Sequence, residues 1–171
     1  MDDSSHERAE IRPAEVTDLS SVETVARTTW PVTYANIIPD DIQHRLLDNW
    51  YSRESLSRAL VAPGSAFFVA ESRGSVIGFA QFMRRSEESV ELTRIYVLPD
   101  RQQSGIGARL LHAGLAAFGE EGFTRMTVVV ERDNISGRRF YERMAFAEPK
   151  ELTQNVHGYS LELVEYRRLI P

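Results

Sequence analysis

The sequence predicts an α/β (α+β) fold, in which helices flank a β-sheet. Runs with helical and strand periodicity alternate along the 171 residues: one strand, two or three helices, three strands, and then a helix, a strand, a helix and a strand. The dipeptide Arg73-Gly74 between two strand-like runs is a hairpin signal. Gly105 and Gly107 mark the passage from an apolar strand into an apolar helix.

Each element is expected from its periodicity and its flanking turn residues. Residues 1–8 are polar and are expected to be a disordered tail, and residues 9–171 to form a single domain. The expected elements, in chain order, are a strand over 9–13, helices over 17–29, 40–47 and 52–60, strands over 66–71, 76–83 and 90–98, a helix over 105–121, a strand over 124–130, a helix over 134–144 and a strand over 158–167.

Local signals set several of these boundaries. Thr17 can cap the first helix, and Pro31 is expected to stop it, which leaves residues 30–39 as an aromatic-rich loop. Gly122 is expected to end the helix that follows the glycine pair, in the left-handed conformation. The β-branched run over 124–130 suits a central strand of the sheet.

Composition excludes several classes of function. A net charge of -5 argues against nucleic acid as a partner. The absence of cysteine excludes disulfides, thiolate nucleophiles and Cys-ligated metals, and His6, His44 and His112 lack metal-ligand spacing, so no metal is expected. No run approaches ~18 apolar residues, so no membrane span is expected. The first ten residues lack the apolar core of a signal peptide, so a cytoplasmic protein is expected.

The glycine pair has two readings. A helix start carries unpaired backbone N–H groups and a partial positive charge, and missing side chains let an anion such as phosphate come close. Alternatively, the glycines only allow tight packing. A dinucleotide fingerprint needs a third glycine where Leu110 stands, and the triphosphate loop G-x-x-x-x-G-K-[ST] does not occur. The remaining candidate ligand is a pyrophosphate carried by a molecule that is neither a dinucleotide nor a triphosphate.

The stretch E-L-T-R-I-Y-V-L-P-D-R-Q-Q-S-G-I-G-A-R-L-L, residues 91–111, resembles motif A of the GNAT superfamily of N-acetyltransferases. That motif is an apolar strand, V-x-P, a polar turn, [QR]-x-x-G-x-[GA] and an amphipathic helix. Its three defined positions are filled by Gln102, Gly105 and Gly107.

A second stretch, N-I-S-G-R-R-F-Y-E-R-M-A-F at residues 134–146, resembles motif B, N-x(6)-Y-x-x-x-G-F. Asn134 and Tyr141 are in register with it. Ala145 stands where the family usually has glycine, which puts the left-handed cap of that helix in doubt. The early stretch W-P-V-T-Y-A-N-I-I-P, residues 30–39, is more weakly similar to PaiA-like polyamine acetyltransferases.

The resemblance implies a mixed, mostly antiparallel sheet of six or seven strands, splayed between the motif A and motif B strands. It implies acetyl-CoA as co-substrate, with its pyrophosphate on backbone N–H groups and its pantetheine arm alongside the motif A strand as if it were another strand. The residues that would bind it are Ile95, Tyr96, Val97, Gln102, Gln103, Ser104, Gly105, Ile106, Gly107, Ala108, Asn134 and Tyr141.

The implied reaction is attack of an amine on a thioester, assisted by an acid and a base. Near neutral pH only roughly one in 10³ alkylamine molecules is unprotonated, so a base helps. By family pattern Glu91 is the base and the Tyr141 hydroxyl protonates the leaving thiolate. Glu131, just after its strand, is the second candidate base, and Glu91 can equally be a solvated carboxylate at a strand end. Asn134 can cap its helix or bind pantetheine.

Three weaker candidates concern the amine acceptor. Trp30 and Tyr34 can wall a pocket, because aromatic faces hold ammonium groups, or they can simply pack in the core. His157, before the last strand, can contact the acceptor or be merely exposed. The expected partner is a primary amine of a small molecule, polyamine-like or amino-acid-like, or of a protein, and a homodimer is left open. The alternative function is a non-catalytic acyl-CoA-binding sensor or regulatory module.

Overall fold

The computed structural model describes residues 8–171. The expected tail over 1–8 therefore lies almost wholly outside the described residues. The helices are α1 (Leu19–Thr33), α2 (Asp40–Trp50), α3 (Arg53–Val61), α4 (Ile106–Glu120) and α5 (Ile135–Arg143). The strands are β1 (Glu10–Pro13), β2 (Ser65–Ser72), β3 (Ser75–Arg84), β4 (Ser89–Val97), β5 (Arg125–Glu131), β6 (Ala147–Val156) and β7 (Tyr159–Leu169). None of the helices within residues 8–171 has the length and apolar character needed to cross a bilayer.

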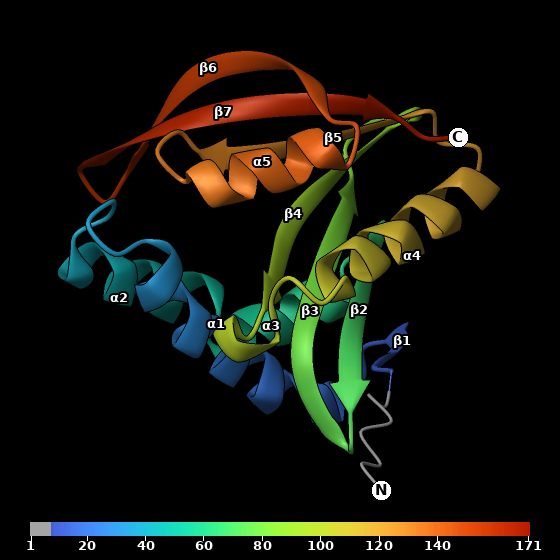
Figure 1. The fold of residues 1–171 in the computed structure, drawn as a ribbon, viewed down its shortest axis with the longest axis horizontal. Helices are drawn as coiled ribbons and strands as arrows, with labels where there is room; N and C mark the ends of the chain where they lie inside the picture. The colour runs from blue at the N-terminus through green and yellow to red at the C-terminus, as the bar shows by residue number, and fades with distance from the viewer. Residues whose placement is uncertain (1–7) are drawn as a thin grey trace, which may run out of the picture.

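The strands form a sheet of seven in the order β1-β2-β3-β4-β5-β7-β6, shown in Figure 1. β4 and β5 pair in parallel, and every other neighbouring pair is antiparallel. This confirms the expected mixed, mostly antiparallel α/β sheet. The chain between the parallel strands passes through α4, as a parallel connection requires.

The parallel strands separate partway along their length. Their pairing begins at Ser89 with Arg125 and ends at Leu92 with Val128, although β4 continues to Val97. On the other side of β4 a bulge leaves Thr93 unpaired, because Gln81 pairs with Arg94 and Phe82 with Leu92. The Thr93 hydroxyl donates to the Gln81 carbonyl at 2.9 Å. The bulge increases the local twist at the point where β4 leaves β5, so the expected splay is present.

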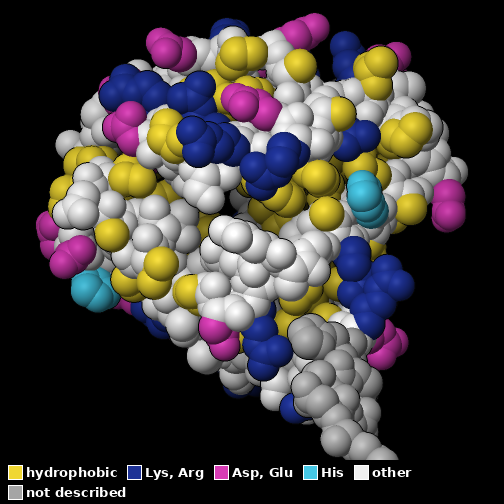
Figure 2. All heavy atoms as spheres, in the orientation of Figure 1, with side chains coloured by type: hydrophobic (Ala, Val, Ile, Leu, Met, Phe, Trp, Pro, Cys, Tyr) yellow, Lys and Arg dark blue, Asp and Glu magenta, His cyan; other side chains and the backbone are white. Residues whose placement is uncertain are grey.

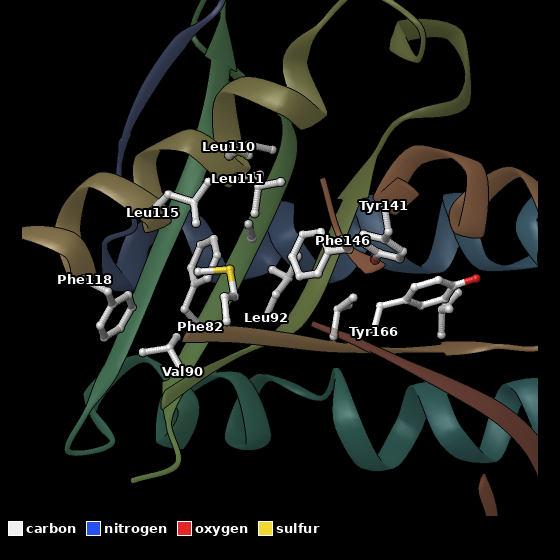
Figure 3. Packing of buried hydrophobic residues seen from close by; sticks show 14 of the residues in the cluster. Phe82, Val90, Leu92, Leu110, Leu111, Leu115, Phe118, Tyr141, Phe146 and Tyr166 are labelled. Atoms are coloured by element: carbon white, nitrogen blue, oxygen red, sulfur yellow. The ribbon is translucent and has the colours of Figure 1, made fainter. Parts of the chain in front are cut away.

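Apolar clusters cover both faces of the sheet. One cluster joins α4 to the sheet through buried side chains such as Leu111, Leu115 and Phe82, which point toward one another in Figure 3. The other joins α1, α2 and α3 to the opposite face, where Leu46 and Leu56 are fully buried. Burial of a side chain of this size contributes about 1.5–3 kcal/mol, so the two clusters stabilise the packing of the helices on the two faces of the sheet.

The prediction that Pro31 stops the first helix is wrong. α1 runs to Thr33 with Pro31 inside its last turn, and residues 30–33 are helical rather than a loop. Proline removes one backbone hydrogen bond and costs about 3 kcal/mol in a helix interior. Near the helix end this cost is offset, since Trp30 and Tyr34 are both buried on one side, with ring centroids 4.7 Å apart.

β6 is absent from the expected elements. Its sequence contains Pro149 and mostly charged or polar residues, and nearly every position is exposed. No alternation of apolar residues predicts β6, because it lies at the edge of the sheet, where β7 is its one neighbouring strand within residues 8–171. A register shift between Ala147 and Lys150 takes up Pro149, which cannot donate to a ladder.

The left-handed cap placed in doubt by Ala145 is present. Ala145 has φ 64 just after α5, the conformation for which the family usually supplies glycine. Phe146, which follows, is buried against Tyr141 with ring centroids 5.7 Å apart. This packing holds Ala145 in a conformation that costs a residue with a Cβ about 1–2 kcal/mol. Arg73-Gly74 and Gly122 also adopt the expected positive φ angles.

Candidate active site

The turn between β4 and α4 is fixed by its own side chains. The Gln102 Nε2 donates to the Val97 carbonyl at 2.9 Å, and the Ser104 hydroxyl donates to the Arg101 carbonyl at 2.5 Å. Gln103 adopts φ 59, so the turn folds back on itself before the helix begins. Gln102 therefore orients the turn, a role that the sequence did not reveal.

Gly105 opens α4 in the left-handed conformation, with φ 81 and no side-chain cap. A Cβ at this position would have no heavy atom within 4 Å, so packing does not require glycine here. Within residues 8–171, the backbone N–H groups from Gln103 to Ala108 make no hydrogen bond to the protein. These donors and the helix dipole together favour an anion.

Gly107 is constrained in a different way. A Cβ on Gly107 would lie 3.4 Å from the Phe140 ring of α5. The second glycine thus lets the start of α4 approach α5 closely, as the packing interpretation expected. Glycine is therefore favoured for a different reason at each position: for its backbone conformation at position 105 and for close packing at position 107.

The face that carries this turn has a band of positive charge. Figure 2 shows dark-blue side chains over α5, beside a hollow with hydrophobic side chains at its base. α5 contributes Arg139 and Arg143, which are exposed, and Arg138, which is partly buried. A ligand that carries phosphates and an apolar arm matches this combination of charge and surface.

The start of α5 is capped by side chains. Asn134 is the N-cap, and its Oδ1 accepts from the Gly137 N–H at 3.0 Å. The Glu131 Oε2 accepts from the N–H groups of Asp133 at 2.6 Å and Asn134 at 3.1 Å. Asn134 thus fills the capping role that its position allowed.

Glu131 is a buried carboxylate at the end of β5. Burial raises its pKa above 4.5, with the Asp133 charge adding to the effect, while the hydrogen bond from the Asp133 N–H opposes it. A raised pKa brings a carboxylate closer to the range in which it can take a proton at neutral pH. Glu131 therefore has an environment suited to a base, although one of its oxygens holds the turn.

Glu91 lies in the paired part of β4, opposite Thr127. Its Oε2 accepts from the Arg85 Nε at 2.6 Å, and a quarter of its side chain is exposed. It is thus a partly exposed, ion-paired carboxylate, and it is the third β4 residue that pairs with β5. Glu91 and Glu131 both stay candidates for the base, with Glu131 at the splayed end of the strands and Glu91 at the paired end.

Three tyrosines from three segments, Tyr34, Tyr51 and Tyr96, meet on the α1 side of the splayed strands, whereas Tyr141 packs in the cluster on the α4 side. The hydroxyls of Tyr34 and Tyr96 are 2.8 Å apart, and the Tyr51 ring centroid lies 6.2 Å from that of Tyr96. Burial raises the pKa of Tyr141, and the nearby hydroxyls of Tyr34 and Tyr51 raise it further. Tyr141 is therefore protonated near neutral pH, and its hydroxyl has a proton to donate.

Sequence reasoning did not single out Tyr51 or the side chain of Tyr96. A signal for Tyr96 was available, since Ile95 and Val97 are apolar and alternate residues of a strand share a face. The intervening tyrosine must then point to the opposite face, which carries the helices α1 to α3. Tyr51 gives no comparable signal, because it only follows the end of α2.

The three acceptor candidates lie in two places. Trp30 is 3% exposed and packs against Tyr34, Tyr51, Trp50 and Tyr96, so its ring is part of the core. Tyr34 presents its hydroxyl to Tyr96. His157 is exposed in the turn between β6 and β7, with Nε2 2.5 Å from Asn49 Nδ2 of α2, so the turn touches the helical side of the molecule.

The described residues contain no group of three or more His, Cys, Asp or Glu side chains that could hold a metal ion. The chemistry available here is that of hydrogen-bond donors, carboxylates and tyrosine hydroxyls. Backbone donors at Gly105, a buried carboxylate at Glu131 and a protonated phenol at Tyr141 surround the splayed strands. This set suits binding of a phosphate-bearing ligand and proton transfer beside it.

Comparison with known proteins gives a consistent result. The profile of the family described as "Acetyltransferase (GNAT) family" matches residues 22–146. A Bacillus subtilis protein named as an uncharacterized N-acetyltransferase is 34% identical over 130 residues, which covers 74% of this chain and 73% of the relative. A spermidine N(1)-acetyltransferase of Thermoplasma acidophilum is 29% identical over 141 residues, covering 80% and 87%.

Solved structures agree. A PaiA N-acetyltransferase of Thermoplasma acidophilum, in complex with coenzyme A, superposes with a TM-score of 0.78 at 26% identity, covering 92% of this chain and 97% of that one. A GCN5-related N-acetyltransferase of Rhodopseudomonas palustris gives a TM-score of 0.79 at 18% identity, covering 95% and 96%, and shares the fold.

Proposed function

The chain belongs to the GNAT acetyltransferase family, an N-acetyltransferase family that uses acetyl-CoA, and we propose that it transfers the acetyl group to a primary amine by direct attack. The observation that carries this proposal is the splay of β4 from β5 beside an uncapped helix start at Gly105. The first opens a slot for an extended arm, and the second offers donors for a pyrophosphate.

Coenzyme binding follows from the free backbone groups. The N–H groups from Gln103 to Ala108 bind the pyrophosphate, and the unpaired edge of β4 from Ile95 to Val97 pairs with the pantetheine amides. Both contacts use backbone, so few side chains need to be fixed. The apolar base of the hollow in Figure 2 suits the methylene groups of that arm.

The acid is Tyr141. As the amine nitrogen bonds to the carbonyl carbon, the carbon–sulfur bond breaks and the sulfur takes up the electron pair. The Tyr141 hydroxyl, kept protonated by burial, donates to this sulfur.

The base is a carboxylate, directly or through water. Glu131 lies at the splayed end of β5 with a raised pKa, whereas Glu91 shares its charge with Arg85. The proton removed from the amine goes to one of these two groups. We favour Glu131, because it lies at the splayed end of the strands with a raised pKa, whereas Glu91 lies in the paired part of β4.

The test is release of free thiol. The protein is incubated with acetyl-CoA and a panel of primary amines, and thiol formation is followed over time. Amine-dependent release supports transfer. Acetyl-CoA binding by calorimetry without thiol release across the panel would instead indicate a non-catalytic acyl-CoA-binding module, and absence of binding would contradict both functions.

A further inference from the structure

A cavity of about 340 Å³ lies between α3 and the strands β3 and β4. It is on the face of the sheet opposite α4, which stands in front of the strands in Figure 1. Its polar lining comes from Arg58 of α3, Gln81 of β3, and Arg85, Thr93 and Arg94 along the β3–β4 hairpin. None of these side chains is used by the coenzyme site.

The cavity carries an excess of positive charge. Arg58 pairs with Glu54 at 2.6 Å, but both side chains are mostly exposed, so this pair is weak. Arg85 pairs with Glu91 at 2.6 Å. Arg94 donates to the Trp50 carbonyl at 2.8 Å and its guanidinium lies 4.8 Å from the Tyr51 ring centroid, and no carboxylate of residues 8–171 pairs with it.

The side of the cavity formed by β3 holds an unsatisfied acceptor. Gln81 is 3% exposed, and its Nε2 donates to the Ser65 hydroxyl at 3.2 Å. Its Oε1 is buried and has no hydrogen-bond partner among the described residues. A buried acceptor without a partner costs about 1–3 kcal/mol.

We propose that this cavity binds the carboxylate of the amine acceptor, so that the substrate is amino-acid-like rather than a polyamine; the inference rests on the proposed function. Thr93 and Arg94 line the cavity at the point where β4 leaves β5. A carboxylate held by the arginines therefore keeps the rest of the acceptor beside the splayed strands. A polyamine would bring ammonium groups against a cavity with a net positive charge, since Arg58 and Arg85 have carboxylate partners but Arg94 has none among residues 8–171.

The first arm of the test compares lysine, lysinamide and cadaverine as acceptors. They share an aminoalkyl chain and differ in carrying a carboxylate, a neutral amide or neither. A charge-assisted hydrogen bond to guanidinium predicts a kcat/KM for lysine at least about tenfold above the other two. Equal values, or a preference for cadaverine, would overturn the inference while leaving acetyl transfer intact.

The second arm uses variants of α3. Arg58→Gln removes one guanidinium from the cavity and should lower the kcat/KM for lysine severalfold without lowering that for cadaverine. Arg53→Gln removes the same charge from the exposed start of the same helix, outside the cavity lining, and should change neither. The same loss with both acceptors would mean that Arg58 only supports the fold.

The third arm does not depend on turnover. Glutarate, a dicarboxylate without an amine, is titrated into the protein and followed by calorimetry. Binding that Arg58→Gln weakens and Arg53→Gln does not supports the site, even if none of the three amines is acetylated. If glutarate fails to bind, or binds equally to Arg58→Gln and the wild type, the carboxylate site is wrong, whatever the acetyl-CoA measurements show.

Discussion

Helices α4 and α5 each begin just after one of the two parallel strands, but their first turns differ. α4 starts at Gly105 with backbone donors that have no partner in the described part of the chain. α5 starts at Asn134, where Asn134 and Glu131 side chains take up three backbone N–H groups. The same helix dipole is therefore available to a ligand at one junction and is satisfied by the protein at the other.

The difference assigns separate tasks to the two junctions. We propose that the open junction binds an anion, and free donors at a helix start lose the stabilising contribution of a cap. The closed junction fixes α5 firmly, and α5 carries Tyr141. Variants of the first junction should therefore change coenzyme affinity, and variants of the second should change turnover or stability.

Tyr141→Phe should give the largest effect. The ring and its packing against Phe146 are kept and only the hydroxyl is lost. If that hydroxyl donates to the departing sulfur, kcat should fall by ~10²–10⁴, while the Kd for acetyl-CoA should barely move. Steady-state kinetics with calorimetry of coenzyme binding give both numbers. A loss of affinity equal to the loss in kcat would place Tyr141 in binding rather than in catalysis.

The two candidate bases are separated by the variants Glu131→Gln and Glu91→Gln. Replacing the true base should lower kcat about 10²-fold at neutral pH. This defect should shrink as the pH rises, because more of the amine is then already unprotonated. The Tyr141→Phe defect should not shrink in this way. We expect the pH-dependent defect for Glu131→Gln and a smaller, flat one for Glu91→Gln; the reverse pattern would make Glu91 the base.

Gly105→Val tests the open junction, with Gly122→Val as the matched control. Both glycines have positive φ, 81 and 87, and a Cβ at either would have no heavy atom within 4 Å, so the two substitutions should cost similar stability. Only Gly105→Val places a side chain against the free donors. Its affinity for acetyl-CoA should fall by about 10–100-fold, the value of one charge-assisted hydrogen bond or slightly more. Equal affinities in the two variants would show that the pyrophosphate binds elsewhere.

Asn134→Ala removes a cap from the closed junction. The Gly137 N–H loses its acceptor, so the free energy of unfolding should fall by about 1 kcal/mol and Tm by about 2–4 °C. Thermal unfolding without coenzyme measures this. If Asn134 also contacts pantetheine, the Kd for acetyl-CoA will rise, which would extend the ligand site across both junctions.

Ala145→Gly should have the smallest effect, and it should be favourable. Ala145 ends α5 with φ 64, a conformation that glycine adopts without strain. The gain is about 1–2 kcal/mol from relieved strain less about 0.5–1 kcal/mol from the greater freedom of unfolded glycine, so it should centre on about 0.75 kcal/mol. A lower free energy of unfolding in urea would mean that the packing of Phe146 relieves the strain on Ala145 fully.

The features of this protein that depend on local chemistry were determined by its sequence alone. Glycine after a strand, the Arg73-Gly74 hairpin and the Gly122 helix end depend on backbone torsions, which neighbouring residues fix. These torsions and the spacing of the two motifs made four features predictable: the order of strands and helices, the start of α4, and the positions of Asn134 and Tyr141. The predicted fold and family are confirmed. Pro31 shows the limit, because burial of Trp30 and Tyr34 outweighs a local helix-breaking signal.

Only the tertiary structure decided which distant residues meet. β6 forms because β7 offers an edge, not because its own residues alternate. The burial of Glu131 and the meeting of Tyr34, Tyr51 and Tyr96 depend on how distant segments pack around the splayed sheet. The cavity between α3, β3 and β4 likewise forms only when these distant elements pack together. These features arise from long-range packing and desolvation, which no local pattern in the chain encodes.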